Sequence, residues 1–525
     1  MEKEYVIGLN RNVNTVQFWK DVETITNLDN IPNRAIEVAN ARSGSNRLTH
    51  YYFTDEEAEI IRQDKRVHCV EIPPDQREDI SIELKAIQPS GSDNNFTKTP
   101  DSEPDSQVDA TGSVKNWGLI RHNSLTNNYG TSSTNNESYT YTLDGKGVDV
   151  VIQDTGIQAN HPEFTDTDGN SRLQEVNWYT VSGISGTQPS GFYTDYDGHG
   201  THCAGIALGK TFGFAKNARI YAQKLGGLQG ASDPNGGIPI SDAFDTIRLW
   251  HANKSGSRPT VVNMSWGYGI TLSANNVSNI HWRGADYTSG DLALDYGVAT
   301  YDNSNPWRHE TRVSSTDVEI QEMIDAGIHV VIAAGNLNYK CEVTGGIDYD
   351  NYFTHGGTDY YYHRGSSPYD NEAIKVGSMS YLSANANTDQ KSNFSNAGPA
   401  VDIYSAGHFI ISSLSNTNVH TEGVYYNDED FKQGILNGTS MAAPQVAGVL
   451  ALMCQVNPKA TPSSIKSSLL AKSGDAFLTG SATNDYTDDS TMGGDNKVLF
   501  NPFSQTSEPG NVTGIESITS NLLLS

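Results

Sequence analysis

The sequence is poor in cysteine and in positive charge, and both shortages limit what the protein can be. Only four cysteines occur among 525 residues, too few for a framework of disulfides in a chain of this length. We therefore expect mostly free thiols. The 35 basic residues are outnumbered by 62 acidic ones, which gives a formal net charge of -27. Such a charge argues against binding to nucleic acids or to anionic membranes.

Long apolar runs are also missing. No stretch approaches the roughly 20 apolar residues that a membrane-spanning helix needs. The opening residues, Met1–Ile7, lack the apolar core of a secretory signal. The compartment therefore stays open between the cytoplasm, a particle and export by another route. At this length the chain can bury a large core and form more than one domain.

Residues 1–75 have the pattern of a small α+β unit. Thr54 and Glu57 form a capping-box pattern at the start of its second helical segment. The order of the segments is βαββαβ, which is that of a ferredoxin-like module. Alternating apolar residues and helical spacing predict these segments at 5–9, 15–26, 34–41, 48–53, 54–62 and 67–72.

Composition then changes twice along the chain. Residues 76–113 are rich in Ser, Asp, Pro and Gln, and we expect a flexible, easily cut linker, with the place of a maturation cut and its occurrence left open. Between residues 114 and 503, continuous apolar strands alternate with helices, which predicts a mainly parallel sheet covered on both faces. Two insertions rich in Tyr, Asn and Ser interrupt this domain at about 268–313 and 340–370, and residues 504–525 form a C-terminal tail.

Three short motifs carry a carboxylate, an imidazole and a hydroxyl. Asp154 ends an apolar strand, at the sheet edge where catalytic groups collect. His199 begins a helix of small residues, and Cys203 follows one helical turn later, where we expect it to pack beneath the imidazole. Ser440 lies where a loop becomes a long apolar helix, so unpaired backbone amides surround it. Together they are the parts of a nucleophile activated by an oriented base.

Asn336 follows a further apolar strand, in the sequence Ala333-Ala334-Gly335-Asn336. Its side-chain amide could donate a hydrogen bond to an oxyanion, beside the backbone amide of Ser440. The plainer interpretation of such an Asn is a left-handed turn residue, and the two roles are compatible.

These motifs, together with Asn263–Gly267, resemble those of the subtilisin-like serine proteases (subtilases), nearest to the proteinase-K-like branch. The chain order Asp, His, Ser is the subtilisin order. The resemblance implies a three-layer α/β domain that hydrolyses peptide bonds through an acyl-enzyme on Ser440. Asp154 would orient His199, His199 would take the hydroxyl proton, and Asn336 would help to hold the oxyanion.

The resemblance extends to substrate binding and to the N-terminal unit. It implies that two segments contact the substrate: Ser265, Trp266 and Gly267, and Ala333, Ala334 and Gly335. Residues 1–75 are similar to inhibitory propeptides of the family, most closely in Thr54–Glu71. The chain after such a unit lies in the substrate cleft. We thus expect a zymogen whose partners are polypeptide substrates and its own prodomain, with the oligomeric state open.

Three questions have alternatives at this point. The function has a rival from another class, a structural or binding protein, for example a particle component, that keeps the fold with little activity. The insertions serve either restricted substrate recognition or loop elaboration. Catalysis needs no cofactor, but the resemblance implies structural Ca²⁺. Weak candidates for its ligands are Asp166, Asp168 and Asn170, which form only a fragment of a calcium loop.

Overall fold

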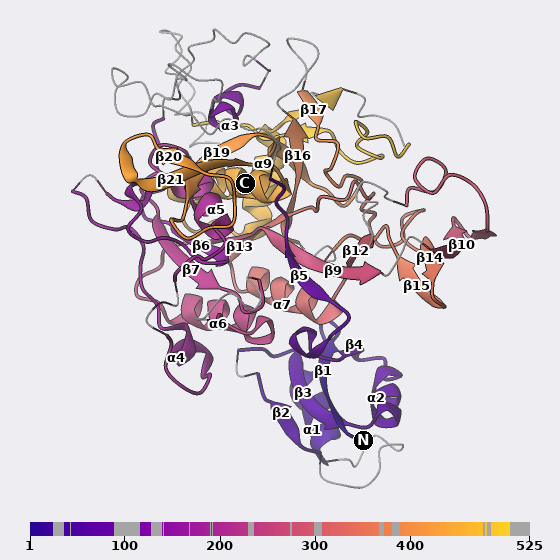
Figure 1. The fold of residues 1–525 in the computed structure, drawn as a ribbon. Helices are drawn as coiled ribbons and strands as arrows, with labels where there is room; N and C mark the ends of the chain where they lie inside the picture. Colours follow the sequence, from indigo (N-terminus) through magenta and orange to yellow (C-terminus); the bar gives the residue numbers. More distant parts are fainter. Residues whose placement is uncertain are drawn as a thin grey trace.

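The protein folds into a small N-terminal unit and a larger α/β domain, seen at the bottom and the centre of the view (Figure 1). The computed structural model describes residues 1–24, 36–42, 44–88, 116–125, 127, 139, 141–166, 168–189, 191, 193–228, 236–272, 276–298, 307–366, 372–380, 389–475, 478–479 and 485–503.

The N-terminal unit has the predicted order βαββαβ. Its four strands form an antiparallel sheet in the order β2-β3-β1-β4. The predicted capping box is present, since Thr54 N donates to Glu57 Oε2 at 2.9 Å and Glu57 N donates to Thr54 Oγ1 at 3.3 Å. The elements are β1 (Lys3–Leu9), α1 (Thr15–Thr24), β2 (Val38–Asn40), β3 (Leu48–Phe53), α2 (Asp55–Arg62) and β4 (Val67–Glu71).

A ten-stranded, mainly parallel sheet forms the centre of the large domain, as predicted. Its main path has the order β22-β24-β18-β16-β13-β8-β6-β7, and β17 and β23 extend it from β16. The strands are β6 (Asp149–Asp154), β7 (Arg219–Lys224), β8 (Thr260–Met264), β13 (His329–Ala333), β16 (Ile374–Ser380), β17 (Asp389–Lys391), β18 (Ile403–Ala406), β22 (Gly474–Asp475), β23 (Leu478–Thr479) and β24 (Lys497–Val498).

Helices cover both faces of this sheet. Val150 of β6 packs into an apolar cluster with α5 (His199–Leu208) and α8 (Thr439–Val456). Its neighbour Val151 packs into the opposite cluster with α6 (Ile240–Asn253) and α7 (Ser314–Asp325). Because adjacent strand residues point to opposite faces, this division gives the three layers expected from the apolar strands. Shorter helical elements are α3 (Trp117–Arg121), η1 (Pro74–Gln76), η2 (Pro162–Phe164), α4 (Trp178–Ser182) and α9 (Pro462–Lys472).

The central helix α8 is long and apolar enough to cross a membrane by length and composition. Within the protein, 89% of it is buried. Its apolar sequence is therefore explained by its place in the core.

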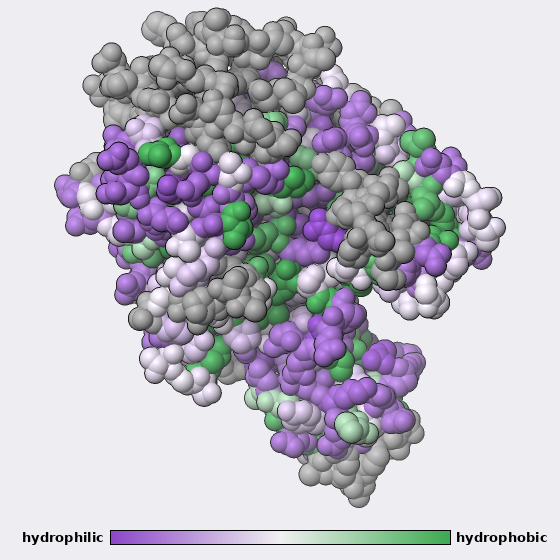
Figure 2. Space-filling view, viewed as in Figure 1, coloured by the Kyte–Doolittle hydropathy of each residue, from purple (hydrophilic) through white to green (hydrophobic). Residues whose placement is uncertain are grey.

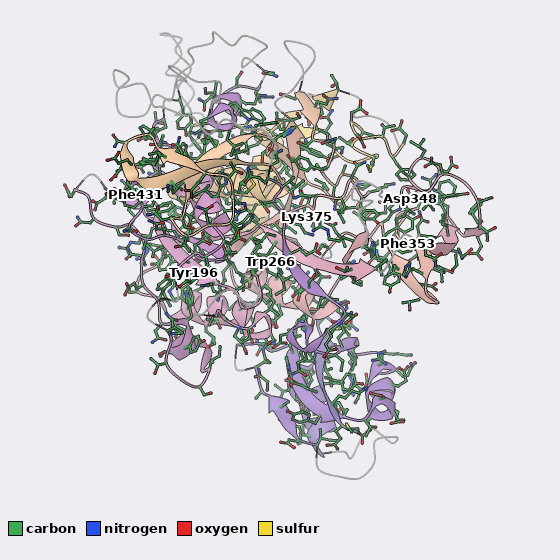
Figure 3. The ribbon with its side chains drawn as sticks, in the orientation of Figure 1. Tyr196, Trp266, Asp348, Phe353, Lys375 and Phe431 are labelled. Atoms are coloured by element: carbon green, nitrogen blue, oxygen red, sulfur yellow. The ribbon has the colours of Figure 1, made fainter. Side chains whose placement is uncertain are left out.

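The two insertions fold together. Strand β10 (Val277–Trp282) of the first pairs with β14 (Tyr352–His355) of the second, in a four-stranded sheet of order β11-β10-β14-β15. Phe353 lies at the centre of its aromatic cluster, on the right of the molecule (Figure 3). The other strands are β11 (Ala285–Tyr287) and β15 (Thr358–Tyr361), while β19 (Ile410–Leu414), β20 (Gly423–Tyr425) and β21 (Asp428–Leu436) form a separate sheet.

The prediction of a flexible linker is wrong for residues 76–88. This segment contains the strand β5 (Ser81–Leu84), which pairs antiparallel with β9 (Trp266–Leu272). On its other side, β9 pairs with β12 (Trp307–Thr311) from the first insertion. The polar composition of residues 76–88 was misleading because this segment is ordered by pairing with β9, which lies far along the chain. Residues 89–113 of the expected linker and the tail at 504–525 lie outside the described residues.

Candidate active site

Asp154 and His199 form a buried pair at the end of the central sheet. Asp154 is the last residue of β6, and its Oδ1 lies 2.7 Å from Nδ1 of His199, the first residue of α5. The Thr155 amide also donates to this oxygen, at 2.8 Å. Burial by itself would lower the pKa of His199, but the charge and hydrogen bond of Asp154, together with the neighbouring Cys203, outweigh it and raise the pKa well above the ordinary value.

Ser440 lies in the first turn of α8, as expected, but its hydroxyl does not meet the imidazole. Its Oγ donates to the carbonyl oxygen of Ser265 at 2.7 Å. Among the described residues no hydrogen bond joins Ser440 to His199, so the predicted contact is absent from this conformation. Cys203 contacts both residues: its Sγ is 3.8 and 3.9 Å from the two ring nitrogens of His199 and 3.4 Å from the Ser440 carbonyl oxygen.

The side chain of Asn336 is oriented by Thr439. Its Oδ1 accepts hydrogen bonds from Thr439 N and Thr439 Oγ1, both at 2.9 Å. The amide nitrogen therefore faces the other way, 3.1 Å from the point where a Cβ of Gly438 would lie. That Cβ would collide with the carbonyl oxygen of Lys85, and Gly438 also has a φ of +145°. Glycine at this position leaves room for the Lys85 carbonyl beside the Asn336 amide.

An extended stretch of the chain itself crosses Ser440. Leu84 pairs with Trp266, and Lys85 N donates to Ser265 O at 3.2 Å. The carbonyl oxygen of Lys85 then accepts the Ser440 amide at 3.1 Å. Figure 1 shows β5 leaving the N-terminal unit and running along β9.

Beyond Ser440 the chain is held again. Ile87 exchanges two backbone hydrogen bonds with Asn437, of 2.6 and 2.8 Å. We call residues 81–87 the occluding segment. Trp266 lies beside this segment, in the middle of the molecule (Figure 3). On the surface of the same region, apolar residues gather above the mostly hydrophilic N-terminal unit (Figure 2).

The Lys85 side chain is buried in an ion pair that the sequence gave no reason to expect. Its Nζ lies 3.1 Å from Glu310 Oε1 and 3.7 Å from Glu83 Oε2. Burial disfavours the charged ammonium, but the carboxylates of Glu310 and Glu83 outweigh it and raise the pKa of Lys85. A cavity of about 200 Å³ adjoins this pair and is also lined by Asn336 and Leu337.

The remaining predicted contact residues lie after β13. Ala333 and Ala334 are buried in the core cluster of α8, and Gly335 N donates to Thr439 Oγ1 at 3.1 Å. Gly335 also adjoins Glu310, because a Cβ at Gly335 would collide with the Glu310 carboxylate. Gly335 thus adjoins the carboxylate that pairs with Lys85.

His202 and the cysteines have structural surroundings. His202 Nε2 lies 3.0 Å from Gly434 O, and burial lowers the pKa of its imidazole to about 3. All four cysteines are free and buried, as the low cysteine count predicted.

The weak calcium candidates form a turn. Asp166 Oδ1 accepts hydrogen bonds from Asp168 N and Asn170 N at 2.9 and 2.8 Å. The second oxygen faces Asn170 Nδ2 at 3.4 Å. The Asp166 carboxylate is thus held by hydrogen bonds within the loop, and calcium binding by these three residues stays a prediction.

Comparison with known proteins decides the family. The subtilase family description matches residues 145–500. The chain belongs to the subtilase family. An extracellular serine proteinase of Thermus sp. is 27% identical over 332 residues, 63% of this chain and 56% of the relative. A cuticle-degrading protease of Metarhizium anisopliae is 27% identical over 354 residues, 66% of this chain and 63% of the relative.

The chain therefore spans less than two thirds of the length of these curated relatives. A solved structure supports the fold of this subtilase. Fervidolysin from Fervidobacterium pennivorans, described as a keratinolytic enzyme related to subtilisin, matches 95% of this chain and 60% of its own, with 17% identity and a TM-score of 0.53.

Proposed function

We propose that this subtilase is a serine endopeptidase made as a self-inhibited zymogen. One observation carries the proposal: the carbonyl oxygen of Lys85 accepts the backbone N–H of Ser440. A peptide bond in an extended chain is thus held against a serine at a helix N-terminus. The buried pair of Asp154 and His199 is close by, since Cys203 Sγ contacts both the His199 imidazole and the Ser440 carbonyl oxygen.

The proposed reaction begins with a rotation of the Ser440 hydroxyl away from Ser265 O and toward His199 Nε2. His199 takes the proton while Ser440 Oγ bonds to the carbonyl carbon, and Asp154 stabilises the imidazolium. The oxyanion is held by the Ser440 amide and the Asn336 side chain. The C–N bond then breaks as His199 gives the proton to the leaving nitrogen, and water hydrolyses the acyl-enzyme in the reverse sequence.

The contacts of the N-terminal unit support its role as an inhibitor. Glu71, at the end of β4, accepts hydrogen bonds from Ser314 N and Ser315 N at 3.2 and 3.0 Å. These amides begin helix α7, whose own N-cap residue provides no side-chain hydrogen bond. A carboxylate at this end satisfies free N–H groups and complements the helix dipole. The unit therefore docks with a charge-assisted contact on the peptidase domain.

The occluding segment supports the same role. It continues from the N-terminal unit and fills the backbone positions along β9 that a substrate would need. Polypeptide substrates would add to this edge in the same way, by strand addition. Inhibition thus requires only that the segment stay in place.

The test compares the full chain with Ser440→Ala. The wild type is expected to cut itself between the two units, to hydrolyse an unfolded protein and to be labelled by a fluorophosphonate. The variant is expected to do none of these while keeping its circular dichroism spectrum. Because a bound inhibitor slows labelling, both proteins are also prepared with Arg42→Ala, which weakens docking of the N-terminal unit. Absence of cutting, hydrolysis and labelling in both backgrounds would favour the rival, a binding protein with a subtilase fold.

A further inference from the structure

We infer that the peptidase selects a basic side chain, Lys or Arg, on the amino side of the bond it cuts, and that Glu310 is the residue that selects it. The inference rests on the proposed function and adds its specificity. It starts from the ion pair between Lys85 and Glu310, both of which are nearly fully buried.

Glu310 comes from the first insertion, not from the central sheet. It lies on β12, opposite Gly269 of β9, so the insertion brings it to the same strand that binds the occluding segment. Asn396 holds the carboxylate through a hydrogen bond from its Nδ2 to Glu310 Oε2. Asn396 is itself fixed, since its Oδ1 accepts the backbone N–H groups of Leu337 and Tyr339. The acidic group is therefore held in place before a substrate arrives.

Two glycines shape the space between Ser440 and Glu310. A Cβ at Gly267 would lie 2.7 Å from Lys85 Cε, so the long side chain passes directly over this residue. A Cβ at Gly335 would collide with the Glu310 carboxylate. The absence of both side chains leaves a channel for an unbranched stem, with a negative charge at its end.

Charge decides what enters this channel. Among the described residues, the hydrogen-bond and ion-pair partners of the Glu310 side chain are Lys85 and Asn396. When the occluding segment leaves, Lys85 leaves with it, and a buried carboxylate keeps only an amide partner. An apolar side chain would leave that charge without a counterion, and an acidic one would repel it. A Lys or Arg side chain restores the pair.

Glu83 and Arg308 do not provide the same selection. Glu83 belongs to the occluding segment, so it departs with Lys85, and its carboxylate is farther from Nζ, at 3.7 Å. Arg308, also on β12, is exposed and lines the adjoining cavity. Among the described residues, Glu310 is thus the carboxylate of the peptidase domain that pairs with the Lys85 ammonium.

The experiment measures kcat/KM on matched peptides after the full chain has completed self-cleavage. In each peptide, Ile-Glu-Leu is followed by Lys, Arg, norleucine or Glu, and this fourth residue directly precedes the bond to be cut. Norleucine keeps the unbranched stem of Lys without its charge. We expect Lys and Arg to exceed norleucine by about 30-fold or more, the effect of pairing a buried charge.

The decisive variant is Glu310→Gln, which removes the charge and keeps the shape. It should reduce cleavage after Lys by a similar factor and leave cleavage after norleucine nearly unchanged. Glu310→Asp should recover part of the preference. The matched control is Asp286→Asn, which neutralises an exposed carboxylate on β11 of the same insertion, away from the cavity. It should behave as the wild type.

Labelling of Ser440 by a fluorophosphonate separates the two possible failures. An enzyme that is labelled but cleaves after norleucine as well as after Lys, or is indifferent to Glu310→Gln, would overturn the role of Glu310 and leave the peptidase proposal intact. A protein that is neither labelled nor active, also in the Arg42→Ala background, would overturn both.

Discussion

The guanidinium of Arg42 lies 2.8 Å from the carboxylate of Asp245, and both side chains are buried where the N-terminal unit meets helix α6. Arg42 also pairs with Glu319 of α7. A single side chain of the N-terminal unit thus pairs with two buried acidic groups of the peptidase domain, of which Asp245 is also paired with Arg248 of α6. Removal of such a partner leaves uncompensated charge and costs about 3–5 kcal/mol.

We therefore predict that Arg42→Ala releases the inhibitory unit. Its affinity after cleavage should fall by at least 100-fold, which is about 2.7 kcal/mol, because Glu319 loses its ion-pair partner and Asp245 keeps only Arg248 of α6. Recovery of peptidase activity with time measures this release. Lys3→Ala removes an exposed ion pair of the same unit, with Asp55, and should change nothing measurable. Equal release by the two variants would contradict the prediction.

The bond between Lys85 and Ala86 should be the site of self-cleavage. Its carbonyl oxygen is the one that accepts the Ser440 amide. Mass spectrometry of the wild type should show a new N-terminus at Ala86, and Ser440→Ala should stay uncut. Lys85→Arg should be cut at the same bond, whereas Lys85→Glu should slow the cut at least about tenfold through repulsion by Glu310. A cut confined to residues 89–113 would count against the geometry.

Asn336→Ala should lower kcat by about 10²–10³-fold with little change in KM. The amide donates to an oxyanion that exists only in the transition state, and this range is usual for the loss of one such donor. Thr439→Val should cost less, because the backbone N–H of residue 439 still anchors Asn336 Oδ1. Steady-state kinetics on a Lys peptide provide the measurement. A change in KM alone would exclude the proposed role.

On the acid side of the pH profile, kcat/KM should reach half of its maximum at a pH above 6.5, the ordinary pKa of an imidazole. His199 works as a base only when neutral, and Asp154 and Cys203 together raise its pKa despite burial. The rate therefore rises as pH increases through that raised pKa, not through the ordinary value. Cys203 and Asp197 also face His199. Asp154→Asn should lower the rate by roughly 10⁴-fold and shift the midpoint of the acid side of the profile to lower pH. A wild-type rate that is flat from pH 6 to 9 would contradict His199 as the base.

The sequence predicted the groups at strand ends and missed the groups that meet across the chain. Asp154 and Asn336 could be placed because each follows an apolar strand, and the ends of parallel strands share one edge. Lys85 and Glu310 are 225 residues apart, and nothing in either local pattern indicates the other. The strand β5 did leave a signal in the alternation of Ile80, Ile82 and Leu84, but the polar residues that follow concealed it.

The conformation of Ser440 was also beyond sequence reasoning. Motif order indicated that three groups converge, and a motif does not specify which acceptor a hydroxyl chooses when a chain lies across it. Here Ser265 O accepts both the Ser440 hydroxyl and the Lys85 amide. The rotamer of Ser440 therefore depends on the chain segment that occupies the site as well as on the motif.

The pairing of β10 with β14 ties two distant loops into a single unit. Deletion of either loop would expose an unpaired strand edge on the other, together with its part of the shared apolar cluster. If Glu310 selects the substrate as proposed, transferring that selectivity to another scaffold consequently requires both loops to be moved together.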